Sequence, residues 1–134
     1  DLDFLLIDMP PGTGDVALTV MQSTPINGVV MVSVPQDMVS MIVAKAVNMT
    51  KKMNIPVLGV VENMSYIVCP GCETKISFNE ENGVNDFLNE MGLTLLGELP
   101  MTRGIAGLTK GKEEGIGELF TPIAVNIIKE IEKL

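Results

Sequence analysis

Gly28-Val-Val-Met-Val-Ser-Val34 and Pro56-Val-Leu-Gly-Val-Val61 decide the fold class, together with the segment that joins them. Both are nearly continuous apolar runs, which is typical of strands buried on both faces of a sheet. The joining segment has apolar residues at helical spacing, namely Met38, Ile42, Ala46, Met49 and Met53. We therefore expect a helix over 38–53 that crosses between two parallel strands.

Further elements extend this unit in both directions. Upstream, Phe4-Leu-Leu-Ile7 predicts another buried strand, which ends at Asp8. Downstream, a short helix around 84–91 is followed by a strand over 95–99, which Pro100 ends. An apolar stripe predicts an amphipathic helix in the tail, with Ile116, Leu119, Phe120, Ile123, Ile127, Ile128, Ile131 and Leu134. Strands that alternate with helices predict an α/β fold, a mostly parallel sheet with helices on both faces.

One stretch breaks this alternation. Residues 66–78 hold Cys69-Pro-Gly-Cys72, followed by the β-forming run Lys75-Ile-Ser-Phe78. A Pro-Gly pair favours a tight turn. We expect a small hairpin, inserted on the sheet, whose turn holds both cysteines.

Length and composition narrow the function. With 134 residues, 46% of them hydrophobic, the chain suits one domain. A net charge of -8 with only 9 Lys and Arg argues against nucleic acid as a partner. The sequence has no basic leader and no apolar run of the roughly 18 residues that a membrane span needs. We therefore expect a cytoplasmic protein without a membrane partner. The absence of histidine excludes His-dependent nucleophiles and His-containing metal sites in this chain.

The start of the sequence indicates a fragment. The chain opens without methionine and enters an apolar run within three residues. We therefore expect a domain that is truncated at its N-terminus.

The first expected strand leads into a loop with possible nucleotide chemistry. Asp8, at the carboxyl end of a strand, is placed to hold Mg²⁺ at a phosphate, although a turn Asp is a common alternative. Pro10-Pro-Gly-Thr-Gly14 follows, and glycine lets the backbone approach a ligand closely. Asp15 fits either this loop or the N-terminus of a helix, where a carboxylate is favourable.

The cysteine pair predicts a metal centre. A zinc ion or a [4Fe-4S] cluster needs four ligands, and the chain offers two thiolates and no imidazole. A symmetric dimer that joins Cys69 and Cys72 of two subunits would complete the set. Zinc is the main alternative to a cluster, and a redox-active pair is the second.

Four blocks together resemble one known family. Asp8-Met-Pro-Pro-Gly-Thr-Gly-Asp15, Val34-Pro-Gln-Asp37, Val61-Glu-Asn-Met-Ser65 and Cys69-Pro-Gly-Cys72 occur in the order seen in the Mrp/ApbC family. These are P-loop ATPases related to MinD that carry iron–sulfur clusters. The resemblance implies that 1–134 is the C-terminal part of a single P-loop ATPase domain.

The resemblance also implies roles for individual residues. Asp8 would be the Walker B carboxylate that holds Mg²⁺, and Gly12 and Thr13 would sense the γ-phosphate of ATP. Asn63 would read the adenine at the end of the third strand, although a turn residue bonded to its own backbone is the alternative. Cys69 and Cys72 would bind a [4Fe-4S] cluster between the subunits of a homodimer.

The expected function follows from these roles. The intact protein would be an ATPase that uses ATP to control delivery of the cluster to apo iron–sulfur proteins. The alternative is a MinD-like positioning or scaffold ATPase with a structural zinc clasp at the cysteines. Gly107-Leu-Thr-Lys-Gly-Lys-Glu113 does not meet the P-loop pattern. The P-loop would lie upstream, so we expect this chain alone to be inactive.

Overall fold

One long strand organises the sheet of this protein. The structure is a computed structural model and describes residues 2–35, 37–78, 83–102 and 117–134. Strand β2 (Val57–Val68) pairs in parallel with β1 (Val29–Ser33) and with β4 (Leu95–Pro100). Its last residues pair in antiparallel fashion with β3 (Lys75–Ser77). The result is a four-stranded sheet in which β2 contacts every other strand.

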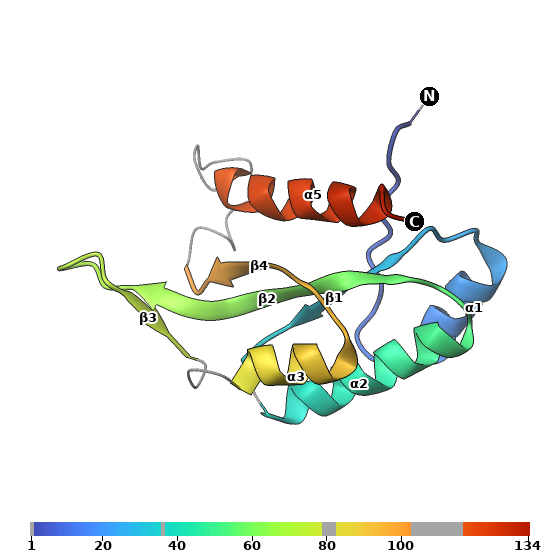
Figure 1. Cartoon of the computed structure of the whole chain (residues 1–134), viewed down its shortest axis with the longest axis horizontal. Helices are drawn as coiled ribbons and strands as arrows, with labels where there is room; N and C mark the ends of the chain where they lie inside the picture. Colours follow the sequence, from blue (N-terminus) through green and yellow to red (C-terminus); the bar gives the residue numbers. More distant parts are fainter. Residues whose placement is uncertain (1, 36, 79–82, 103–116) are drawn as a thin grey trace.

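Helices cover both faces of the sheet. Helices α2 (Asp37–Lys52) and α3 (Gly83–Met91) lie on one side, and α5 (Gly117–Ile131) lies on the other (Figure 1). Helix α1 (Asp15–Ser23) precedes β1 and packs at the end of the sheet away from the hairpin (Figure 1). This arrangement confirms the predicted α/β fold with a mostly parallel sheet.

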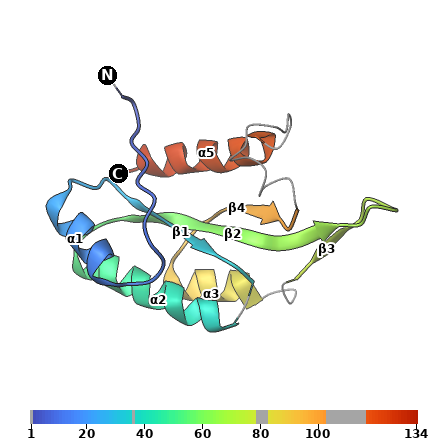
Figure 2. The same ribbon diagram turned by 180° about the vertical axis from the view of Figure 1, so that it is seen from behind.

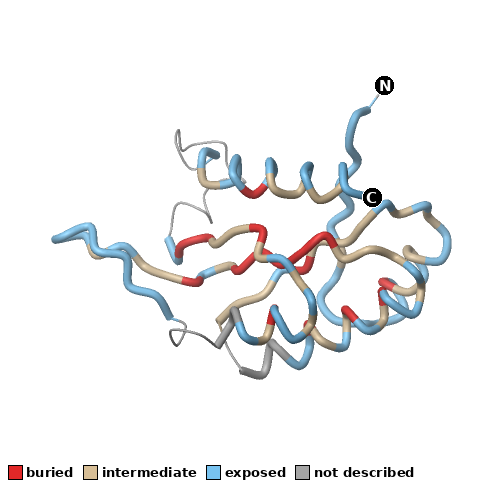
Figure 3. Tube along the Cα trace, viewed as in Figure 1, coloured by how far each residue is buried: buried red, intermediate tan, exposed pale blue. Residues whose placement is uncertain are grey.

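Two apolar clusters hold the layers together, one on each face. Between the sheet and α2 and α3 lie Met31, Val43, Val47, Val60 and Leu88. Between the sheet and α5 lie Val61, Leu96, Leu99 and Ile123. The consecutive residues Val60 and Val61 therefore serve opposite faces, as the alternation of a strand requires. Figure 3 shows that the buried residues concentrate along the middle of the sheet.

The predicted helices are confirmed, but their buried faces differ from the predicted stripes. Among the α2 side chains that the structure describes, Val43, Val47 and Thr50 are buried, whereas Ile42 is exposed. The Met38 side chain of the predicted stripe lies outside the described part. The helix thus turns the side that carries Val43 and Val47 toward the sheet. Ala46, Met49 and Met53, which belong to the predicted stripe, are only half-buried. Apolar residues at helical spacing predict a helix. They do not determine which side of it is buried when two adjacent stripes along the helix are both apolar.

The tail helix follows the same rule. In α5, Ile123 is buried, while Phe120 and Ile128 of the predicted stripe are exposed, as is Leu134 beyond the end of the helix. Only a narrow line of the helix therefore faces the sheet. Ile116, and the segment 107–113 that fails the P-loop pattern, lie outside the described residues.

The predicted strand over residues 4–7 is wrong. The segment has no regular secondary structure and runs as a coil past β1 and α5 to α1 (Figures 1 and 2). Leu5 is 72% exposed and Leu6 is 87% exposed. An apolar run creates a tendency toward burial, but a buried strand also needs hydrogen-bonding neighbours. The described strands do not pair with this segment.

Helix length bears on membrane insertion. The longest described helix, α2, has 16 residues. Among the described residues, no helix is both long enough and apolar enough to cross a bilayer.

Truncating two leucines tests this account of the core. Leu96 is fully buried in the α5-side cluster, so Leu96→Ala should lower the free energy of unfolding by about 2–5 kcal/mol. Leu6→Ala should change it by less than about 0.5 kcal/mol, because that side chain is exposed. Urea denaturation followed by circular dichroism measures both values. A large loss for Leu6→Ala would mean that the first segment is a buried strand after all.

Candidate metal centre

The two cysteines lie in the turn of the hairpin that β2 and β3 form. The ladder pairs Tyr66 with Ser77 and Val68 with Lys75. Beyond it, the Cys69 backbone N–H donates to the Thr74 carbonyl at 3.0 Å, and the Glu73 N–H donates to the Cys69 carbonyl at 2.9 Å. These bonds close the turn, which confirms the predicted hairpin. Figure 1 shows the hairpin projecting beyond the helices at one end of the molecule.

Both thiols are free, and the turn presents them to solvent. Cys69 is half-buried and Cys72 is exposed. The Cys72 Sγ lies 3.1 Å from the Thr74 hydroxyl. Hydrogen bonding to the Thr74 hydroxyl, then to the Thr74 backbone and to Cys69, lowers the pKa of the Cys72 thiol below its usual value. The turn therefore favours the thiolate, which is the form that binds metals.

The ligand set is incomplete within one chain. Among the described residues, no group of three or more Cys, His, Asp or Glu side chains is placed to hold a metal ion. Two thiolates supply half of the four ligands that tetrahedral zinc or a [4Fe-4S] cluster requires. The arrangement can therefore act as one half of a site.

Side-chain contacts at the base of the hairpin link all three neighbouring strands. Lys75 Nζ lies 4.2 Å from the centre of the Tyr66 ring and 2.7 Å from Glu98 Oε2. The Ser65 carbonyl accepts from Phe78 N–H and the next carbonyl, that of Tyr66, accepts from Met101 N–H. Consecutive carbonyls point to opposite edges of a strand, so β3 and β4 flank β2. The Lys75 side chain thus reaches across Tyr66 to β4 and fixes the base of the hairpin.

Asn63 lies inside β2, so the prediction that the third strand ends before it is wrong. The strand continues to Val68 because β4 and then β3 pair with its second half. The register with β4 shifts between Glu62 and Tyr66, and Met64 in this interval has φ 54°. Asn63 Oδ1 accepts a hydrogen bond from the Met64 N–H at 3.0 Å. The side chain is thus bonded locally, as in the alternative, but to the N–H of the next residue and from within a strand, not a turn. The adenine role stays a prediction.

Asp8 is not at the end of a buried strand, because its segment forms no strand. Asp8, Gly12 and Thr13 are all exposed. Gly12 has φ 92° and no atom within 4 Å of a built Cβ, which leaves its backbone open to a ligand. Residues 2–14 lie away from the hairpin, toward the opposite end of the molecule (Figures 1 and 2). The structure thus does not bring the Asp8 loop and the cysteines together.

Asp15 is the first residue of α1, in keeping with the helix-N-terminus alternative. Its carboxylate lies where the helix dipole favours a negative charge. The proline-rich loop therefore ends in an ordinary helix start.

A row of polar residues crosses the carboxyl half of the parallel sheet. Ser33 of β1 and Glu98 of β4 are both in register with Glu62 of β2. Glu62 is buried, with 2% of its surface exposed, and it has an interaction partner. Ligands of open α/β sheets bind beyond the carboxyl ends of strands. Glu62 directly precedes Asn63 but is not among the site residues predicted from the sequence.

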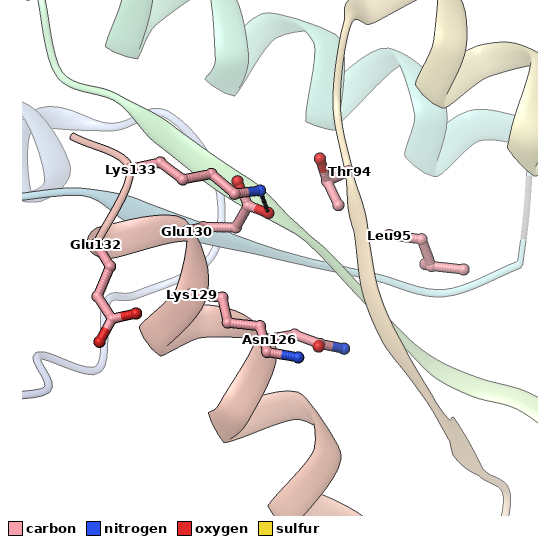
Figure 4. A pocket seen from close by; sticks show the side chains of 7 residues that line it. All are labelled: Thr94, Leu95, Asn126, Lys129, Glu130, Glu132 and Lys133. Carbon is pink, nitrogen blue, oxygen red and sulfur yellow. Dashed lines mark hydrogen bonds and ion pairs between the residues drawn. The ribbon is translucent and has the colours of Figure 1, made fainter.

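A hollow of about 520 Å³ lies elsewhere, between α5 and the start of β4 (Figure 4). Asn126 Nδ2 donates to the Leu96 carbonyl at 2.9 Å, which ties the helix to the strand. Lys133 Nζ pairs with Glu130 Oε1 at 2.6 Å. None of the predicted site residues lines this hollow.

Thr74 is the residue that sequence reasoning missed. Its hydroxyl contacts Cys72 and its carbonyl closes the turn at Cys69. A hydroxyl residue two positions after the second cysteine was the available signal. Its effect depends on turn geometry, which spacing alone does not supply.

Removal of this hydroxyl should change the titration of Cys72. In Thr74→Val the Cys72 thiolate loses a hydrogen-bond donor, so its pKa should rise and alkylation at neutral pH should slow several-fold. Thr74→Ser keeps the hydroxyl and serves as the control. Iodoacetamide labelling over a pH series, resolved by mass spectrometry, measures Cys72 separately from Cys69. An unchanged midpoint in Thr74→Val would show that the hydroxyl does not stabilise the thiolate.

Known proteins are similar to this chain in sequence and in fold. An iron-sulfur cluster carrier protein of Clostridium perfringens is 52% identical over 120 residues, which are 90% of this chain and 41% of that protein. The iron-sulfur cluster transfer protein NUBPL of Dictyostelium discoideum is 41% identical over 136 residues, 98% of this chain and 42% of that protein. A nucleotide-binding protein of Archaeoglobus fulgidus, solved in complex with ADP, superposes with a TM-score of 0.69 and 39% identity, over 81% of this chain and 44% of that one.

These matches define both the family and its extent here. The chain spans less than half the length of each of these relatives. The family model of the NUBPL iron-transfer P-loop NTPases, in the ParA group, matches residues 1–132. This agrees with the resemblance inferred from the four sequence blocks. The chain belongs to the NUBPL iron-transfer P-loop NTPase family.

Proposed function

We propose that this protein is an iron–sulfur cluster carrier whose cargo binds at Cys69 and Cys72. The observation that carries the proposal is the exposed turn, which presents two thiols as half of a ligand set. A [4Fe-4S] cluster would be held by four thiolates, two from each subunit of a homodimer. Relatives named as cluster carrier and transfer proteins support the same cargo.

The position of the turn suits a cluster that must leave again. Cys72 is exposed, and the pair lies at the end of a projecting hairpin (Figure 1). A recipient protein can approach a cluster there without unfolding the core. Transfer to apo iron–sulfur proteins would then be an exchange of ligands, in which thiolates of the recipient replace Cys69 and Cys72 on the cluster.

A structural zinc clasp is the competing assignment. Soft thiolates bind zinc as well as clusters, and zinc would also need two subunits. The parallel sheet and both apolar clusters are formed by residues outside the turn. The core of the chain thus lies apart from the turn, and the exposure of Cys72 favours a releasable cargo over a structural clasp.

ATP dependence is the second part of the proposal. We take residues 1–134 to be the C-terminal part of one P-loop ATPase domain. In it, Asp8 would hold Mg²⁺, and Gly12, Thr13 and Asn63 would contact ATP. The residues described here do not fit a nucleotide on their own. The sequence has no G-x-x-x-x-G-K-[ST] motif, and Asp8 stands on a coil away from the sheet. The ADP-bound Archaeoglobus relative supports nucleotide binding by a longer chain.

The remaining expectations complete the proposal. We expect a cytoplasmic protein that contacts its own second copy and apo iron–sulfur recipients. The net charge of -8 argues against nucleic acid as a further partner.

Anaerobic reconstitution with iron and sulfide tests the cargo. We expect a broad visible absorption that disappears in Cys69→Ala and in Cys72→Ala, because one remaining thiolate per chain cannot hold the cluster. Ser77→Ala, in the same hairpin, is the control and should keep the absorption. Stoichiometric zinc that resists exchange, with no visible band in the unaltered protein, would instead establish the clasp.

Isothermal titration with Mg-ATP tests the nucleotide part. The 134-residue chain should show no saturable micromolar binding, because it lacks the lysine and the backbone loop that hold phosphates. Saturable micromolar binding by this chain would contradict the proposed division of the nucleotide site.

A further inference from the structure

The hairpin has two chemically different faces. Residues that pair across the ladder share a face, and successive residues alternate between faces. One face carries Tyr66, Val68 and Lys75, and on it Lys75 Nζ contacts the Tyr66 ring and Glu98. The other face carries the directly opposed pair Ile67 and Ile76.

Cys69 belongs to the second face. The Cys69 N–H donates to the Thr74 carbonyl at 3.0 Å, and the Phe78 N–H donates to the Ser65 carbonyl at 2.9 Å. These bonds continue the same register at both ends of the ladder, so Cys69 and Phe78 share a face with Ile76. Ile76 is 46% exposed and Phe78 is 45% exposed. We name Ile67, Ile76 and Phe78 the apolar hairpin face.

A partner that packs on the apolar hairpin face would also lie beside the cysteines, where further metal ligands are needed. The described part of the chain offers no third metal ligand near them. Two further thiolates therefore have to arrive beside the apolar hairpin face. A second copy of this chain brings both at once through a two-fold axis, and the same axis brings its own apolar hairpin face to the contact.

Charge points to the same occupant. Two copies of a chain with a net charge of -8 repel each other over most of their surfaces. Apart from the two cysteines, the charged residues within 66–78 are Glu73 and Lys75, which cancel. The hairpin therefore carries much less negative charge than the chain as a whole, and it is apolar on the side that carries Cys69.

We propose that the apolar hairpin face is the surface on which the second copy packs, and that it excludes water from the shared cluster. This inference rests on the proposed cluster-carrier function. A hydrophobic shell controls the access of solvent to a metal site. The opposite face, on which Lys75 contacts Tyr66 and Glu98, would lie outside this contact.

Sedimentation velocity of the anaerobically reconstituted protein tests the inference. Ile76→Glu and Phe78→Glu place a charge on the apolar hairpin face. Each should convert the cluster-loaded dimer to monomer and lower bound iron several-fold. Val68→Glu is the matched control, because Val68 is similarly exposed, at 50%, but lies on the other face. It should keep both the dimer and the iron.

The outcomes separate this inference from the function on which it rests. Unaltered protein that takes up no cluster would sink the carrier proposal itself. A cluster-loaded dimer that survives both Ile76→Glu and Phe78→Glu would overturn the inference and leave the carrier proposal standing. So would a dimer that Val68→Glu disrupts equally, or variants that keep the dimer but fail only in transfer to a recipient. Unchanged circular dichroism of the apo variants excludes misfolding as the cause of dimer loss.

Discussion

The structure depends on the backbone hydrogen bonding of one strand. β2 is 12 residues long and pairs with every other strand of the sheet. Its first half is the centre of the parallel sheet, and its side chains reach the apolar clusters on both faces. Its second half leaves that core and becomes one arm of the hairpin. Core, polar row and cysteine turn are therefore successive parts of a single strand.

This continuity explains how an exposed site can be held in place. Beyond the core, the hairpin depends on its ladder with β3 and on the contact of Lys75 with Tyr66 and Glu98. An exposed ion pair contributes only about 0–1 kcal/mol to stability. The hydrogen bonds between β2 and β3 therefore contribute most of the stabilisation of the hairpin. The turn beyond it is closed by Thr74, whose hydroxyl also favours the Cys72 thiolate. In a single chain, the site is thus held in place at its base and exposed at Cys72.

The sequence predicted those features that local chemistry determines. Apolar runs located β1, the start of β2 and β4, helical spacing located α2 and α5, and Pro70-Gly71 located the turn. Features that depend on tertiary partners were missed. Residues 4–7 had the composition of a strand without strand neighbours, and β2 continued past Val61 because β3 and β4 pair with it. The contact of the Thr74 hydroxyl with Cys72 could not be predicted from the sequence, because it depends on how the turn closes.

The central claim is that one chain holds half of a cluster site. Native mass spectrometry of the anaerobically reconstituted protein measures this directly, because it weighs the protein and its metal in one particle. The account predicts a particle of two chains that holds four iron and four sulfide ions, with no such particle formed by Cys69→Ala. A single chain that retains a complete cluster, or two chains that hold only zinc, would contradict it.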